Sequence, residues 1–145
     1  MIMHTCSEVI SFGKKLENES ADFYNTLSQK YPQDSDVFLT FARENDKNVV
    51  QVQRSYYGVI SDAFEGCFAF DVEPDSYTFN TALAENVSYA EALDRAIEIE
   101  EKMIKFYSDA AGQSKALMAD VPRVFMIIAR KRQSRIEKLN SLSKE

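Results

Sequence analysis

Six polar residues interrupt parts of the sequence that are otherwise apolar at steps of three and four, the spacing of the buried face of a helix. Two of them are glutamates, one in each of two segments, and the other four form two pairs spaced i and i+3 in two further segments. Carboxylates that converge between helices can bind a metal ion or pair with guanidinium groups. The six residues are Glu17, Glu100, the pair Asn45 and Asn48, and the pair Arg132 and Arg135.

Four amphipathic helices must position these side chains. Thr5-x-x-Glu8 and Ser88-x-x-Glu91 are candidate capping boxes for the first and third helices, whose ends are marked by Pro32 and Gly112. The predicted helices run from about Ser7 to Lys30, from Ser35 or Asp36 to about Ser61, from about Tyr89 to Ala111, and from near Pro122 to about Leu142.

The loops between these helices predict the topology. Short loops join the first helix to the second and the third to the fourth, which indicates two antiparallel hairpins at about 7–62 and 88–142. A crossover at about 63–87 is long enough to span a helix, and its aromatic residues favour packing on the bundle or on a second subunit. We therefore expect a single all-α domain over residues 1–145. The aromatic residues are Phe64, Phe68, Phe70, Tyr77 and Phe79.

The two hairpins resemble each other in sequence. KLENESADFY at 15–24 aligns with EIEEKMIKFY at 98–107, and VFLTFAREN at 37–45 aligns with VFMIIARKR at 124–132. In this alignment Glu17 matches Glu100, and Tyr24 matches Tyr107. The sequence thus predicts that the domain is one duplicated hairpin.

A glutamate on each of two helices with i, i+3 polar pairs on the other two is the layout of a di-iron carboxylate bundle, where each pair reads Glu-x-x-His. In this layout the chain resembles the rubrerythrin-like branch of the ferritin-like superfamily. The resemblance covers all four helices, including the Glu-x6-Tyr spacing of the first and third and the Ala-Arg that precedes the expected Glu-x-x-His of the others. It implies a ferritin-like four-helix bundle, a homodimer, and tyrosines, here Tyr24 and Tyr107, next to the metal ligands.

The sequence departs from this family at four of six ligand positions. Asparagines stand at 45 and 48 and arginines at 132 and 135, and the only histidine, His4, precedes the first helix. A guanidinium is a permanent cation without a lone pair to offer, so it is no metal ligand. We therefore expect no metal cofactor, and a buried Glu/Asn/Arg network in its place. The implied protein is rubrerythrin-like, has lost its di-iron centre and is not a catalyst.

Two alternatives remain open. The first is an oxidoreductase or peroxidase of the rubrerythrin type that binds iron or manganese through Glu17, Glu100 and an asparagine carbonyl. The second is a pocket in which Arg132 and Arg135 bind a small anion. Five other acidic residues could in principle bind a metal, but their helical positions favour the solvated face. These residues are Glu19, Glu44, Asp46, Glu98 and Glu101.

Composition limits the partners. The formal net charge of −6 argues against general binding to nucleic acid or to an anionic membrane surface. Neither a signal-peptide pattern nor a long apolar run occurs, so we expect a cytoplasmic protein with a protein or small-ligand partner. The basic run at 130–135 is short, and two of its arginines have the inward phase.

Overall fold

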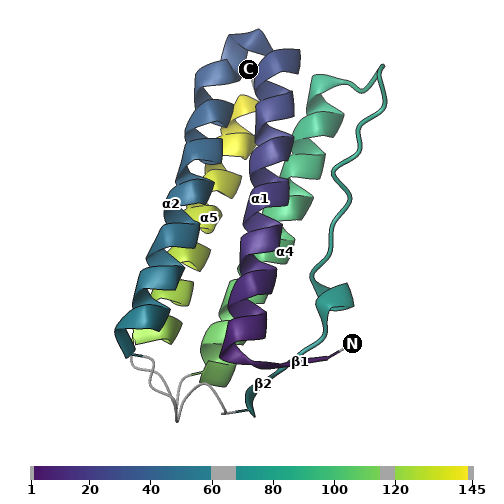
Figure 1. Cartoon of the computed structure of the whole chain (residues 1–145). Helices are drawn as coiled ribbons and strands as arrows, with labels where there is room; N and C mark the ends of the chain where they lie inside the picture. Colours follow the sequence, from purple (N-terminus) through teal and green to yellow (C-terminus); the bar gives the residue numbers. More distant parts are fainter. Residues whose placement is uncertain (1, 60–67, 115–119, 144–145) are drawn as a thin grey trace.

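Four long helices pack side by side in the computed structural model, which describes residues 2–59, 68–114 and 120–143 (Figure 1). Helix α1 packs along α2, α4 packs along α5, and α2 also packs against α5. The helices are α1 (Cys6–Lys30), α2 (Ser35–Val59), α4 (Tyr89–Ser114) and α5 (Asp120–Leu142). Two hairpins joined by a long crossover are thus confirmed, in a mostly helical fold.

The start of α1 follows from its cap. The Thr5 side-chain oxygen accepts a hydrogen bond from the Glu8 main-chain N–H at 3.1 Å, and a Glu8 carboxylate oxygen accepts one from the Thr5 N–H at 3.1 Å. These reciprocal bonds satisfy donors that the first turn of a helix leaves free. The predicted capping box is therefore confirmed.

Two predicted helix boundaries need correction. Helix α4 continues through Gly112 to Ser114, whose hydroxyl donates to the main-chain carbonyl of Ala110 at 2.9 Å. Gly112 does not adopt a positive φ, so it does not end the helix. Helix α5 begins at Asp120, which leaves Pro122 inside the first turn, where a proline removes no intrahelical hydrogen bond. The predicted end of the second helix, at Ser61, lies outside the described residues.

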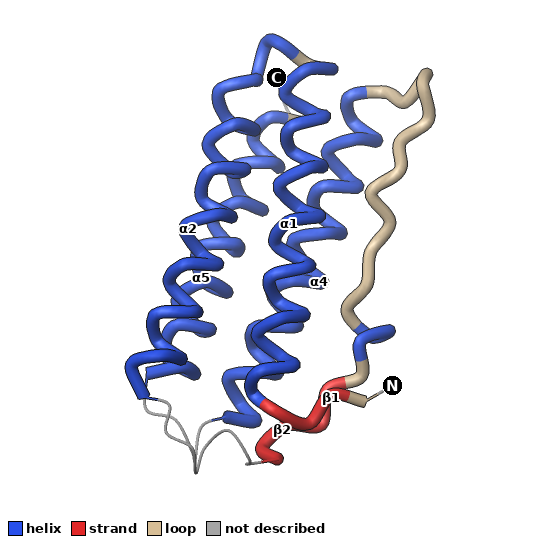
Figure 2. Tube along the Cα trace, in the orientation of Figure 1, coloured by secondary structure: helices blue, strands red, loops and turns tan. Residues whose placement is uncertain are grey.

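A short antiparallel sheet was missed by the sequence analysis, so the fold is mostly rather than wholly helical. Strand β1 (Met3–Thr5) pairs with β2 (Phe68–Val72), with Met3 opposite Val72 and Thr5 opposite Phe68 (Figure 2). Strands this short carry too few residues for a period-two pattern to stand out. The sheet ties the chain before α1 to the start of the crossover.

The described part of the crossover lies against the bundle. It contains β2 and the 3₁₀ turns of η2 (Pro74–Ser76), then runs along α4 as an extended loop (Figure 2). Tyr77 is buried and its hydroxyl donates to a carboxylate oxygen of Asp109 on α4 at 2.6 Å. Phe70 is also buried, and Phe79 is partly buried against the core. Phe64 lies outside the described residues.

The buried residues follow the predicted spacing on every helix. Phe23, Tyr24, Phe106 and Tyr107, which the alignment of the two hairpins pairs, all lie in the core with at most 2% exposure. A further short 3₁₀ helix, η1 (Pro32–Asp34), connects α1 to α2. Within the described ranges, no helix is long and apolar enough to cross a membrane.

Candidate functional site

Arg132 occupies the centre of the bundle, between two glutamates from different helices. Its Nη2 lies 2.5 Å from Oε2 of Glu17 on α1, and its Nη1 lies 2.7 Å from Oε2 of Glu100 on α4. The side chains of all three residues are at most 1% exposed. Nη2 also lies 3.3 Å from Oδ1 of Asn45 on α2, so this one guanidinium connects all four helices.

The phase of α5 explains why a charged residue lies so deep. Ile128 lies four residues from Arg132, and Phe125 and Leu139 lie seven residues from it, so all three are buried on the same stripe. Lys131, one position earlier, is exposed. Burial of these apolar residues sets the rotation of α5 about its axis. Because Arg132 lies on the same stripe, its side chain is buried as well.

Arg135 extends the network toward the surface. Its Nη1 donates to Oε1 of Glu100 at 3.2 Å, and its Nη2 donates to the main-chain carbonyl of Phe41 at 2.9 Å. The guanidinium also lies 4.8 Å from the centre of the Phe41 ring and 5.6 Å from that of Tyr24, within range of a cation–π contact.

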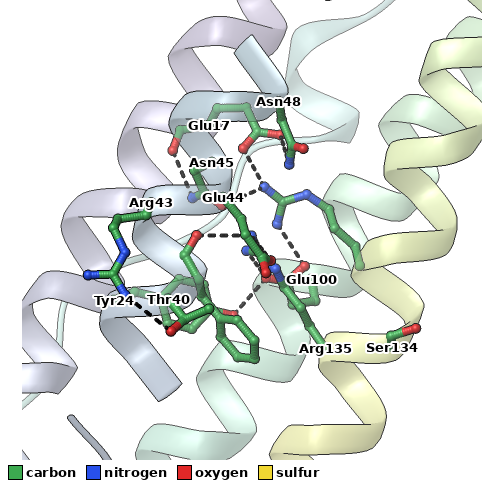
Figure 3. A network of polar contacts seen from close by, with 12 residues as sticks. Glu17, Tyr24, Thr40, Arg43, Glu44, Asn45, Asn48, Glu100, Ser134 and Arg135 are labelled. Atoms are coloured by element: carbon green, nitrogen blue, oxygen red, sulfur yellow. Dashed lines mark hydrogen bonds and ion pairs between the residues drawn. The ribbon is translucent and has the colours of Figure 1, made fainter. Parts of the chain in front are cut away.

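Glu44 is a member of this network that the sequence analysis placed on the solvated face, and that placement is incomplete. Its carboxylate lies 3.3 Å from Nη2 of Arg135 (Figure 3), while 42% of its side chain stays exposed. A residue at the border of an apolar stripe can turn inward or outward, and helical periodicity alone does not distinguish the two. The sequence offered one indication, which is that Glu44 directly precedes Asn45, a predicted member of the polar layer.

The asparagines both bind Glu17. The Asn45 amide donates to the main-chain carbonyl of Glu17 at 3.1 Å, and the Asn48 amide donates to its Oε1 at 3.5 Å. Both asparagines are at most 2% exposed. Asn48 and Arg132 thus donate to a carboxylate that would be costly to bury alone, while Asn45 binds the main chain of the same residue.

The two tyrosines cross between the hairpins. Tyr24 on α1 donates to Oε1 of Glu100 on α4 at 2.7 Å, and Tyr107 on α4 donates to Oε1 of Glu17 on α1 at 2.6 Å. All four carboxylate oxygens of the two glutamates therefore accept at least one hydrogen bond. Burial raises the pKa of both hydroxyls, and the adjacent glutamate raises each pKa further.

The charges of the network support one another. Burial alone would raise the pKa of Glu100, but Arg132 and Arg135 outweigh it and hold that pKa below its usual value. Burial likewise opposes the charge on Arg132, and Glu100 and Glu17 outweigh it, so the pKa of Arg132 is raised. The structure thus confirms a buried Glu/Arg salt-bridge network, in which the inner four side chains carry two charges of each sign.

These residues do not fit a di-iron centre. The guanidinium of Arg132 already bonds one oxygen of each glutamate, so a divalent cation would have to approach a fixed positive charge at close range. The part of the chain that the structure describes contains no group of three or more His, Cys, Asp or Glu residues that could hold a metal ion. His4 lies on β1, where its ring Nδ1 is 3.1 Å from the carbonyl oxygen of Phe70.

A cavity of about 10 Å³ touches the network at Glu17 and Tyr107. A volume of this size holds about one water molecule. The cavity also borders Gly13, where an added Cβ would lie 3.1 Å from Cε2 of Phe106. Beside Glu17 the helices are thus packed too closely for a substrate larger than water.

Comparisons of the chain with protein-family models, with curated proteins and with solved structures gave no match. The site therefore has to be interpreted from its own geometry.

Proposed function

We propose that this protein is a rubrerythrin-like member of the ferritin-like superfamily in which a permanent ion-pair network has replaced the di-iron centre. Its function would then be non-catalytic: a stable four-helix scaffold that binds or assembles with a partner. The topology supports this proposal, because two hairpins joined by a long crossover are the arrangement of that fold.

The contact of Arg132 with both Glu17 and Glu100 is the observation that supports the proposal most directly. In the family pattern these two glutamates bind metal, and the remaining ligands come from the positions of Asn45, Asn48, Arg132 and Arg135. Here the guanidinium provides the positive charge that two buried carboxylates need. A guanidinium has no accessible second oxidation state and no open coordination position, so it cannot take over the redox role of a metal.

Counting metals tests the proposal. The protein is incubated anaerobically with excess Fe(II) or Mn(II), desalted, and analysed for metal per chain. We expect a value close to zero for both metals. One or two metals per chain would instead support the alternative of a metal-dependent oxidoreductase that uses Glu17 and Glu100.

A rebuilt variant provides the matched control. Asn45→Glu, Asn48→His, Arg132→Glu and Arg135→His together restore the ligand types of the family pattern at the four altered positions. If these positions are a former metal site, the folded variant takes up metal where the wild type does not. A variant that folds by circular dichroism and still binds no metal would contradict the proposed ancestry of the site.

The alternative of a small-anion pocket has little support from the geometry. Arg132 and Arg135 already direct both terminal nitrogens at carboxylate or carbonyl oxygens, so an anion would have to displace an existing partner. Thermal stabilisation by phosphate or sulfate that disappears in Arg135→Ala would favour this alternative.

The family resemblance also implies a homodimer, which we propose as the assembly state. Sedimentation velocity over a range of protein concentrations measures it directly. A single species with the mass of one chain at all concentrations would contradict it.

A further inference from the structure

One side of the bundle carries an uncompensated positive charge. The crossover runs along α4, on the side away from α2 (Figures 1 and 2), and Arg95 of α4 donates to the carbonyls of Asn80 and Ala82 in the crossover. The side formed by α2 and α5 has no such cover among the described segments. It is therefore a free surface within the ranges that the structure describes.

A hollow of about 640 Å³ lies on this side, and we call it the basic hollow. Its cations are Lys47 and Arg54, seven residues apart and so on one face of α2, and Lys131, which comes from α5. All three are exposed. The described residues that line it are Asp46, Lys47, Val50, Gln51, Arg54 and Lys131.

The three cations have no partner within the described part of the chain: none forms an ion pair or a side-chain hydrogen bond there. Glu44, an acid on the same helix, is already bound to Arg135 of the buried network. Asp46 is the only acid among the described residues of the lining. The hollow thus holds three positive charges against one negative charge, in a chain whose net charge is −6.

An exposed apolar side chain lies among these cations. Val50 is 44% exposed, and among the described residues only Ile2 matches it as an exposed large hydrophobic residue. A single exposed valine is ordinary on a protein surface. Surrounded by unpaired cations, however, it adds an apolar contact to an electrostatic one, and this combination favours a ligand that carries both kinds of group.

We propose that the basic hollow binds an acidic segment of a partner protein, with an apolar side chain against Val50 and carboxylates toward Lys47, Arg54 and Lys131. The inference rests on the proposed function of a non-catalytic scaffold and names the chemistry of its partner. Charge complementarity of this kind speeds association and selects the partner.

Nucleic acid fits the hollow less well. None of the described residues that line it is aromatic, so these residues offer bases no ring to stack on. A long polyanion would also extend beyond three cations into the field of a chain with net charge −6. A short acidic segment contacts the hollow alone and avoids that repulsion.

The test uses a fluorescein-labelled 12-residue peptide in which leucines are flanked by glutamates, and the same peptide with glutamine in place of glutamate. Anisotropy is measured with the wild type, with Lys131→Glu, with Val50→Ser, and with Lys15→Glu, which makes the same charge change at an exposed site on α1. We expect the wild type to bind the acidic peptide and not the glutamine peptide. Lys131→Glu and Val50→Ser should each lower the affinity for the acidic peptide by about fivefold or more, and the affinity of Lys15→Glu should stay within about twofold of wild type. All substituted side chains are exposed, and circular dichroism verifies that each variant folds.

Several outcomes would overturn the proposal. The first is no binding of the acidic peptide at about 1 mM protein, which corresponds to a negligible affinity. The second is an equal loss of binding in Lys131→Glu and Lys15→Glu, which would indicate the overall charge rather than the hollow. A single-stranded oligonucleotide that binds more tightly than the peptide, and loses binding in Lys131→Glu, would identify a nucleic-acid site instead.

The fourth contrary outcome concerns a second copy of the chain. If Lys131→Glu, and not Lys15→Glu, dissociates an oligomer in sedimentation velocity, the hollow is an interface between copies. None of these results depends on the metal count, so failure here and failure of the proposed function are separate outcomes.

Discussion

The Tyr107 hydroxyl donates a 2.6 Å hydrogen bond to Oε1 of Glu17, 90 residues away in the sequence. The equivalent pair, Tyr24 of the first hairpin and Glu100 of the second, makes the same contact in the opposite direction at 2.7 Å. Each hairpin therefore provides a tyrosine to the glutamate of the other. This exchange joins the two halves of the bundle at the level of Arg132, which binds both glutamates.

Arg132→Leu is expected to destabilise the protein strongly. Removing one partner of a buried ion pair leaves uncompensated charge in the core, at a typical cost of about 3 to 5 kcal/mol. The neighbouring substitution Lys131→Leu changes an exposed residue and should stay within about 0.5 kcal/mol of wild type. Urea denaturation of both variants measures the difference, and equal midpoints would contradict the role of Arg132.

Neutralising Glu17 and Glu100 together with Arg132 should restore part of this loss, while Arg135 keeps its ion pair with Glu44. In Arg132→Leu combined with Glu17→Gln and Glu100→Gln, no carboxylate is left in the core without its guanidinium. We expect the triple variant to be more stable than Arg132→Leu alone, because an unpaired buried charge costs more than a neutral polar group. A triple variant less stable than the single one would show that the packing of the arginine, and not its charge, is what the core requires.

Acid should weaken the fold through Glu100. Its pKa is lowered in the folded state from the ordinary value of 4.5, so its stabilising contribution is complete above about pH 4.5 and is lost as the pH falls through the folded pKa. Glu100→Gln should therefore reduce the slope of unfolding free energy against pH below about 4.5. Glu101→Gln is the control, because it makes the same chemical change at the neighbouring, exposed position.

Alkali should act through the buried tyrosines. The pKa of Tyr24 and of Tyr107 is raised well above 10.0, so their contribution is complete below about pH 10 and is lost as the pH rises through the folded values. In a titration followed at the tyrosinate absorption band, these two hydroxyls should ionise only when the chain unfolds. Tyr24→Phe and Tyr107→Phe should each remove one tyrosine from that late step. Ionisation of both near pH 10 in the folded protein would be the contrary result.

Gly112 offers a stabilising substitution. It lies at an exposed position inside α4, where an added Cβ would meet nothing within 4 Å, so Gly112→Ala should stabilise the helix by about 0.5 to 1 kcal/mol. Gly13→Ala is the matched comparison inside α1, where the new Cβ would lie 3.1 Å from Phe106. Thermal melting should show a gain for Gly112→Ala only. A similar gain for Gly13→Ala would mean that the Phe106 ring moves aside without cost.

The sequence by itself determined the four helices, their pairing into hairpins and the polar layer between them. The spacing of apolar residues is a local property of the sequence. Because Phe125, Ile128 and Leu139 are buried on one face of α5, Arg132, which lies on the same face, is directed into the core. Capping residues such as Thr5 and Glu8 fixed the start of α1 for the same local reason.

Only the tertiary structure decided which polar groups meet. The hydrogen bonds of Tyr24 and Tyr107 to glutamates of the opposite hairpins depend on how the hairpins lie against each other. The contact of Glu44 depends on the position of the Arg135 guanidinium. The pairing of β1 with β2 joins residues more than 60 positions apart, and strands of three and five residues carry no periodic signal. Long-range contacts of this kind are set by the packing of whole helices, which a pattern within one helix does not encode.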